Sequence, residues 1–205
     1  MTILTTLENA GLISRTAQSI RSVVESHFGD LLTMPINPPS AFVDTMYSRY
    51  KNLPNGVQNN NLNGKVFELL IAVTLYRSGI RPLYQQAIIS YVPNVEFDFT
   101  AFCNDESIIS ISTKTSFRER WKQADLEALA LKSVHRKARC YLVSYEIPDA
   151  KGVQKKILNG GAMGLDQSIS AITSDFDTLI ASFNQHKFIS PPIVPLMKSA
   201  QLSST

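Results

Sequence analysis

Two stretches of alternating apolar and polar residues, joined by a short polar segment, constrain the fold of this chain most strongly. Within residues 95–102, one predicted strand face carries Val95, Phe97, Phe99 and Ala101, and the other carries Glu96, Asp98, Thr100 and Phe102. Within residues 107–114, one face carries Ile109, Ile111 and Thr113, and the other carries Ile108, Ser110, Ser112 and Lys114. The segment between them, residues 103–106, resembles a turn, so the pattern predicts an antiparallel hairpin.

The predicted hairpin brings two opposite charges together. A turn centred near Asp105 sets Asp98 opposite Ser112 and diagonal to Lys114, within the roughly 7–8 Å reach of diagonal neighbours. Asp98 and Lys114 can then act on one ligand. A simple ion pair between them is the alternative, and their spacing does not exclude it.

A predicted helix over residues 118–132 follows the second strand. Its apolar stripe, which we expect to pack on the sheet, consists of Trp121, Ala124, Ala128 and Leu131. Glu127 flanks this stripe thirteen positions after Lys114, on nearly the same side of the helix as Arg120. A carboxylate there is well placed to share a metal ion with Asp98, although most helical Glu side chains are only solvated.

A fourth charged residue lies in an apolar helix. Asn63 is a plausible N-cap for a helix over residues 64–78, and Gly79 is a plausible stop. This helix is apolar almost all round, so we expect it to be buried with Glu68 embedded in its surface. Burial of a lone carboxylate costs several kcal/mol unless it is paired, protonated or bound to metal. Glu68 is therefore either functional or paired with a group such as Lys65.

The run of basic residues around the predicted helix start indicates a DNA-reading surface. The net charge is only +3, but eight of the twenty Lys and Arg residues fall between Lys114 and Arg139, which favours local phosphate binding. The triplet Arg118, Glu119 and Arg120 pairs basic with acidic side chains, as suits a G·C pair in the major groove. Local salt bridges on an exposed helix are the alternative.

The order helix Glu68, strand Asp98, strand Lys114 and helix Glu127 resembles type II restriction endonucleases of the PD-(D/E)XK superfamily. It is most similar to the EcoRII-like subgroup, in which the second acidic residue has migrated from the strand to the following helix. Ser112 stands where the usual motif has Glu or Asp, and Phe97 stands where Pro often precedes the Asp. The resemblance implies an α/β fold: a restriction-endonuclease-like core with a mixed central sheet flanked by helices, here with an N-terminal helical region.

The resemblance also implies a function. It predicts a Mg²⁺-dependent, sequence-specific endonuclease that cuts double-stranded DNA at a palindrome containing CCGG or CC(N)GG. Asp98 and Glu127 are the expected metal ligands, with Glu68 beside them or on a second ion, and Lys114 lies against the scissile phosphate. The expected DNA contacts are Ser116, Arg118, Glu119, Arg120 and Lys122. A two-fold palindrome suggests a homodimer, and a higher oligomer is compatible with it.

Two alternatives remain open: a structure-specific repair or mobile-element nuclease of the same superfamily, and a DNA-binding module without catalysis. We expect one domain over residues 1–205, in which a helical region (1–60) precedes the catalytic core (63–146). A C-terminal helical region (147–188), with a helix over 165–183, and an irregular tail (189–205) follow. The absence of an apolar run of about 18 residues and of a signal peptide predicts a cytoplasmic protein with no membrane partner, and the resemblance implies that it is prokaryotic. The histidines have no metal-ligand spacing, and Cys103 and Cys140 are expected to be reduced thiols.

Overall fold

A mixed seven-stranded sheet forms the centre of the computed structural model, which describes residues 2–14, 16–54, 58–92, 94–116, 120–191 and, by backbone alone, 196–202. The strand order is β5-β4-β3-β2-β1-β7, and the short β6 pairs with β2. Neighbours β3, β4 and β5 run parallel, and the other pairs are antiparallel. The strands are β1 (Leu83–Ile89), β2 (Phe97–Cys103), β3 (Ile108–Lys114), β4 (Arg139–Ser144), β5 (Gln167–Ser170), β6 (Phe188–Ile189) and β7 (Leu196–Leu202).

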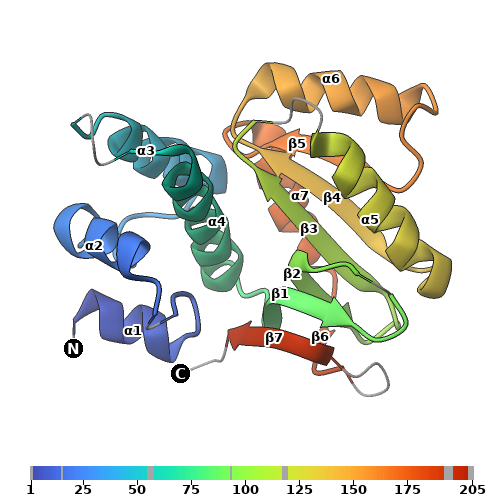
Figure 1. Ribbon diagram of the computed structural model, residues 1–205, viewed down its shortest axis with the longest axis horizontal. Coiled ribbons are helices and arrows are strands. Elements are labelled where there is room, and N and C mark those ends of the chain that lie inside the picture. The colour runs from blue at the N-terminus through green and yellow to red at the C-terminus, as the bar shows by residue number, and fades with distance from the viewer. Residues whose placement is uncertain are drawn as a thin grey trace.

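Helices cover both faces of this sheet (Figure 1). They are α1 (Ile3–Asn9), α2 (Gln18–His27), α3 (Pro39–Lys51), α4 (Asn60–Arg77), α5 (Arg120–Val134), α6 (Ile147–Leu158) and α7 (Ser174–Phe183). In one apolar core, the helices α1, α2, α3, α4 and α7 pack on one face of the sheet. Ile109 and Ile111 of β3 point into this core. A second core joins α5 and α6 to the other face, where Ile108 of β3 and Leu142 of β4 point. The central strands are therefore buried on both sides.

The hairpin predicted for residues 95–114 is confirmed. Strands β2 and β3 pair with Phe99 opposite Ile111 and Ala101 opposite Ile109, and continuation of this register sets Asp98 opposite Ser112. The predicted single face for Val95, Phe97, Phe99 and Ala101 is wrong, however. Val95 and Phe97 pack into the core beneath α5, whereas Phe99 and Ala101 pack into the core beneath α4. The alternation therefore changes phase at Asp98.

The buried helix predicted around Glu68 is also present, but it begins earlier. Asn59, not Asn63, is the N-cap of α4, and its Oδ1 accepts a hydrogen bond from the Leu62 amide at 2.9 Å. Asn63 lies within the first turns and accepts a 2.8 Å hydrogen bond from the Tyr50 hydroxyl. At the other end, α4 stops before Gly79, whose φ of +84° is a left-handed conformation that glycine tolerates.

The predictions for the C-terminal third are partly wrong. Residues 167–170, expected to begin a helix, form the edge strand β5, and α7 starts only at Ser174. The expected irregular tail (189–205) begins at the end of β6 and contains β7, which pairs with β1 at the opposite side of the sheet. Helix α6, which falls within the predicted C-terminal helical region (147–188), lies between β4 and β5. These strands depend on pairing with distant segments, which a local pattern does not reveal.

Helix α5 is fixed to the loop before β5 by a buried carboxylate. Asp125 accepts hydrogen bonds from the backbone amides of Gly164 at 2.8 Å and Leu165 at 3.0 Å through Oδ1, and from Met163 at 3.2 Å through Oδ2. Ala124, Ala128 and Leu131 are buried against the sheet, as predicted. Glu127, two residues after Asp125 in α5, is thereby held at a defined position. In the described part of the chain, no helix has the length and apolar character needed to cross a membrane.

Candidate active site

The β2–β3 hairpin joins Asp98 to the end of β3. Asp98 Oδ2 accepts hydrogen bonds from the Thr113 amide at 2.7 Å, the Thr113 hydroxyl at 3.2 Å and Lys114 Nζ at 3.3 Å. The side chains of Lys114 and Asp98 expose 19% and 18% of their surface. The ion pair that the spacing allowed is therefore present, and it lies in a partly buried position. It orients both groups without explaining the acidic residues nearby.

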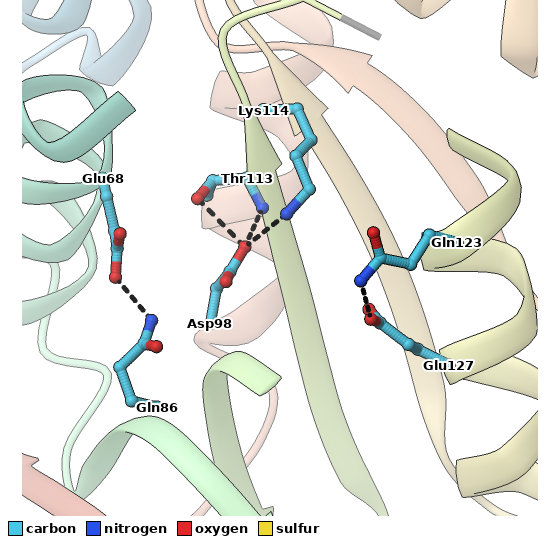
Figure 2. Close-up of polar contacts among 7 residues, drawn as sticks. All are labelled: Glu68, Gln86, Asp98, Thr113, Lys114, Gln123 and Glu127. Atoms are coloured by element: carbon cyan, nitrogen blue, oxygen red, sulfur yellow. Dashed lines mark hydrogen bonds and ion pairs between the residues drawn. The ribbon is translucent and has the colours of Figure 1, made fainter. Parts of the chain in front are cut away.

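Helix α4 supplies Glu68 from one side of this pair (Figure 2). Its Oε1 accepts a 2.8 Å hydrogen bond from Gln86 Nε2 on β1. The sequence suggested Lys65 as a partner for Glu68. Lys65 is exposed, however, and the side-chain amide of Gln86 donates the hydrogen bond to Glu68 instead. Burial and, after it, the negative charge of Asp98 raise the pKa of Glu68 to about 7, against the opposing effects of the Gln86 hydrogen bond and the charge of Lys114.

Helix α5 supplies Glu127 from the other side (Figure 2). Glu127 is half-buried, and its Oε1 accepts a 2.7 Å hydrogen bond from Gln123 Nε2 one turn earlier. Burial raises the pKa of Glu127 above its ordinary value, and Asp98 adds to this effect. The hydrogen bond from Gln123 and the positive charge of Lys114 oppose the rise.

Two helices on opposite faces of the sheet therefore direct carboxylates toward the same ion pair. The charge of Asp98 raises the pKa of both Glu68 and Glu127, and the charge of Lys114 lowers both. Repulsion among three carboxylates would be relieved by a hard divalent cation, for which oxygen is the preferred ligand. The donor set thus fits Mg²⁺. The oxygen atoms of the three carboxylates do not all lie within 4.8 Å of one another, so joint binding of one ion would require side-chain movement or bridging water.

The predicted DNA-reading residues lie beside this site along the chain. Ser116 is half-buried just beyond β3, and Arg120 and Lys122 are exposed in the first turn of α5. Arg118 and Glu119 lie outside the described residues. Lys156 of α6 stands over the Trp121 ring, 5.4 Å from its centroid, and adds a positive charge near this turn. Lys and Arg side chains are common donors to the phosphates and base edges of DNA.

A second group of metal-type side chains, not anticipated from the sequence, lies at the hairpin turn. Ligand atoms of Cys103, Asp105 and His186 all lie within 4.8 Å of one another. Hydrogen bonds account for this group. Asp105 Oδ1 accepts from the amide and hydroxyl of Ser107, and Arg139 Nη1 lies 3.0 Å from His186 Nε2. Because arginine has no acceptor, Nε2 of His186 accepts this hydrogen bond.

Sequence reasoning missed the residues that hold the acidic side chains. Gln86 is eighteen positions from Glu68, and no spacing rule connects a helix residue to a residue in the following strand. Thr113 was recognised only as a strand residue, although its amide and hydroxyl both reach Asp98. Gln123 could have been found, because it lies one helical turn before Glu127.

Comparison with solved structures shows that the chain has a restriction-endonuclease-like fold, as predicted. The matching structure is that of the restriction endonuclease PspGI in complex with substrate DNA. It is 19% identical to this chain in sequence, with a TM-score of 0.55, and the match covers 88% of this chain and 84% of that chain. No protein-family model and no curated protein matches the sequence.

Proposed function

We propose that the protein is a Mg²⁺-dependent, sequence-specific endonuclease of the type II restriction class, in the EcoRII-like subgroup, that cuts double-stranded DNA. The observation that carries this proposal is the placement of Glu68 and Glu127 on either side of the Asp98–Lys114 pair, whose charges act on both. A fold shared with a restriction endonuclease supports it. Structural packing alone does not require three acidic residues around one lysine.

Each residue has a distinct role in this proposal. Asp98 and Glu127 would hold Mg²⁺, and Glu68 would hold the same ion through water or bind a second ion. The bound ion would activate water and stabilise charge on the phosphate. Lys114, anchored by Asp98, directs its ammonium group at the scissile phosphate and orients the attacking water. The water adds to phosphorus, the bond to the leaving oxygen breaks, and that oxygen takes up a proton.

Specificity is assigned to the residues after β3. Arg120 pairs with guanine, Glu119 accepts from cytosine, and Ser116, Arg118 and Lys122 hold the adjacent backbone. The expected target contains CCGG, or CC and GG around a short spacer. The two-fold symmetry of such a site is matched by a homodimer.

Incubation of the purified protein with phage DNA, with and without Mg²⁺, tests the proposal. Discrete fragments whose sequenced ends share a CC/GG palindrome are the expected result. Cutting confined to branched or damaged DNA would instead indicate a repair or mobile-element nuclease. Tight, salt-dependent binding with no cutting in Mg²⁺ would contradict a catalytic role and indicate a DNA-binding module.

A further inference from the structure

An unusual backbone conformation lies in β1 beside the candidate active site. Gln86 has a φ of +48°, in the left-handed region that side chains other than glycine rarely adopt. Tyr91, Asn94 and Glu106 also have positive φ, but they lie in turns or bends. Among the described residues, Gln86 is the one non-glycine residue with positive φ inside a strand. Such conformations persist where the surrounding structure imposes them, and they cluster at functional sites.

The effect of this conformation is to change which face of the sheet β1 addresses. Leu83 packs into the core beneath α4, and regular alternation would send Ala87 to the same core. Ala87 packs instead into the core beneath α5. The pairing between β1 and β7 shifts register between Gln85 and Ile88 and again between Ile88 and Ile89, so a β-bulge or similar irregularity interrupts β1 here, and we refer to it as the β1 bulge.

The bulge directs two consecutive side chains to the same side. Gln85 and Gln86 both line a pocket of about 240 Å³ next to α4, together with Lys65, Glu68 and Leu69. In a regular strand, the side chains of two neighbouring residues point to opposite faces of the sheet. The irregular backbone is thus what brings the Gln86 amide to Glu68, at 2.8 Å.

Gln86 also lies next to Asp98, which is its neighbour on the adjacent strand β2. Tyr84 pairs with Thr100, Gln85 with Phe99 and Ala87 with Phe97, so this register sets Gln86 opposite Asp98. In β2, the alternation of side chains between the two faces is interrupted at Asp98, as it is at Gln86 in β1. This is seen from Phe97 and Phe99, which pack into different cores. The backbone of Gln86 therefore lies beside one acidic residue while its side chain holds another.

We propose that Gln86 is a positioning residue, whose left-handed backbone within the β1 bulge holds Glu68 in place to bind a divalent ion beside Asp98. This inference rests on the proposed function and adds to it the element that aligns the α4 carboxylate with the strand carboxylate. Charged groups that act on Glu68 are Asp98 and Glu96 from the β2 side and Lys114 from β3. Gln86 contributes a neutral donor among these charges.

Substitution by glycine separates this role from a role in folding. Gln86→Gly removes the amide but tolerates positive φ, so the bulge is retained and the melting temperature should equal or exceed that of the wild type. Loss of a partner that orients a metal-binding side chain typically weakens metal affinity about 10–100-fold. We therefore expect Mn²⁺ binding, measured by the loss of the free-ion EPR signal, to weaken about tenfold or more.

Gln85→Ala is the matched control, because Gln85 is the same residue type, neighbours Gln86 and lines the same pocket. Its Nε2 is buried and has no hydrogen-bond partner in the described part of the chain. We expect Gln85→Ala to bind Mn²⁺ as the wild type does. Excess Mg²⁺ should restore DNA cutting in Gln86→Gly, because the chemical groups are intact and only ion affinity is reduced.

The outcomes distinguish this inference from the function on which it rests. If the wild type cuts DNA and Gln86→Gly binds Mn²⁺ with unchanged affinity, the positioning role is wrong and the proposed function stands. If the wild type binds no Mn²⁺ and cuts no DNA, the proposed function fails, and the inference fails with it. If Gln85→Ala weakens Mn²⁺ binding as much as Gln86→Gly does, the effect comes from the pocket as a whole and not from the Gln86 amide.

Discussion

At the scale of single residues, Lys114 has two possible roles that its contacts alone do not separate. It makes a partly buried ion pair with Asp98, which would suit a structural role, and it stands between Glu68 and Glu127, which would suit catalysis (Figure 2). A structural lysine would affect stability when removed. A catalytic lysine would affect the rate of DNA cutting much more than the stability.

Lys114→Ala and Glu127→Ala should each lower the rate of DNA cutting by about 10²–10⁴-fold, as expected when a charged group acting on the transition state is lost. Specific DNA binding, measured by gel shift in Ca²⁺, should be largely retained. Lys137→Ala is a suitable control, because Lys137 is exposed and contacts Glu106 at the distant hairpin turn. Normal cutting by Glu127→Ala would show that the migrated-carboxylate assignment is wrong.

Glu68 should make stability depend on pH in the metal-free protein. Its pKa is raised from 4.5 to about 7 in the folded state, so its favourable contribution is complete below pH 4.5 and is lost as pH rises through about 7. The loss would amount to at most about 3 kcal/mol. Urea unfolding in EDTA at pH 5 and pH 8 should show a smaller fall for Glu68→Gln than for the wild type. An equal fall in the two proteins would refute the raised pKa.

At the scale of elements, the sequence predicted best where local pattern and tertiary structure agree. The β2–β3 hairpin, the buried α4 and the apolar stripe of α5 all follow from periodicity that one strand or helix displays by itself. The phase change at Asp98 was missed because Phe97 and Phe99 are equally apolar, and only the packing of two separate cores assigns them to different faces. Strand β7 was missed because its pairing partner is more than a hundred residues away.

The attachment of α5 to the loop before β5 gives a test of element packing. A Cβ atom on Gly164 would lie 2.3 Å from the Asp125 carbonyl oxygen and 2.5 Å from the Leu129 nitrogen, both backbone atoms of α5. Gly164→Ala should therefore cost about 3 kcal/mol of unfolding free energy. Gly152→Ala in α6 meets no atom within 4 Å and should stabilise the protein by about 1 kcal/mol. Similar effects of the two substitutions in urea unfolding would contradict this close approach.

At the scale of the whole molecule, the sequence predicted which residues belong to the candidate site but not how they are arranged in space. The identities of Asp98, Lys114, Glu127 and Glu68 were inferred from their order along the chain and from a family resemblance. Their mutual approach depends on α4 and α5 covering opposite faces of one sheet, which no spacing encodes. Gln86 was invisible for the same reason, since its contact with Glu68 depends on a bulge.

The proposed palindromic target gives a prediction for assembly. Sedimentation with a CC/GG-containing duplex should show two chains per DNA site, because a two-fold target is matched by a two-fold protein. Dissociation constants should be measured at several salt concentrations, since phosphate contacts make them salt-dependent. One chain per duplex at saturating protein would rule out the dimeric arrangement.

The placement of the acidic residues on two separate helical layers also has a consequence for the proposed activity. Glu68 lies in α4 and Glu127 in α5, and the sheet between them must be complete before both reach Asp98. A nascent or half-assembled chain therefore carries an incomplete set of ligands. If the chain is a nuclease, it becomes dangerous to DNA only after maturation, so the architecture itself would act as a safeguard for the host chromosome during synthesis.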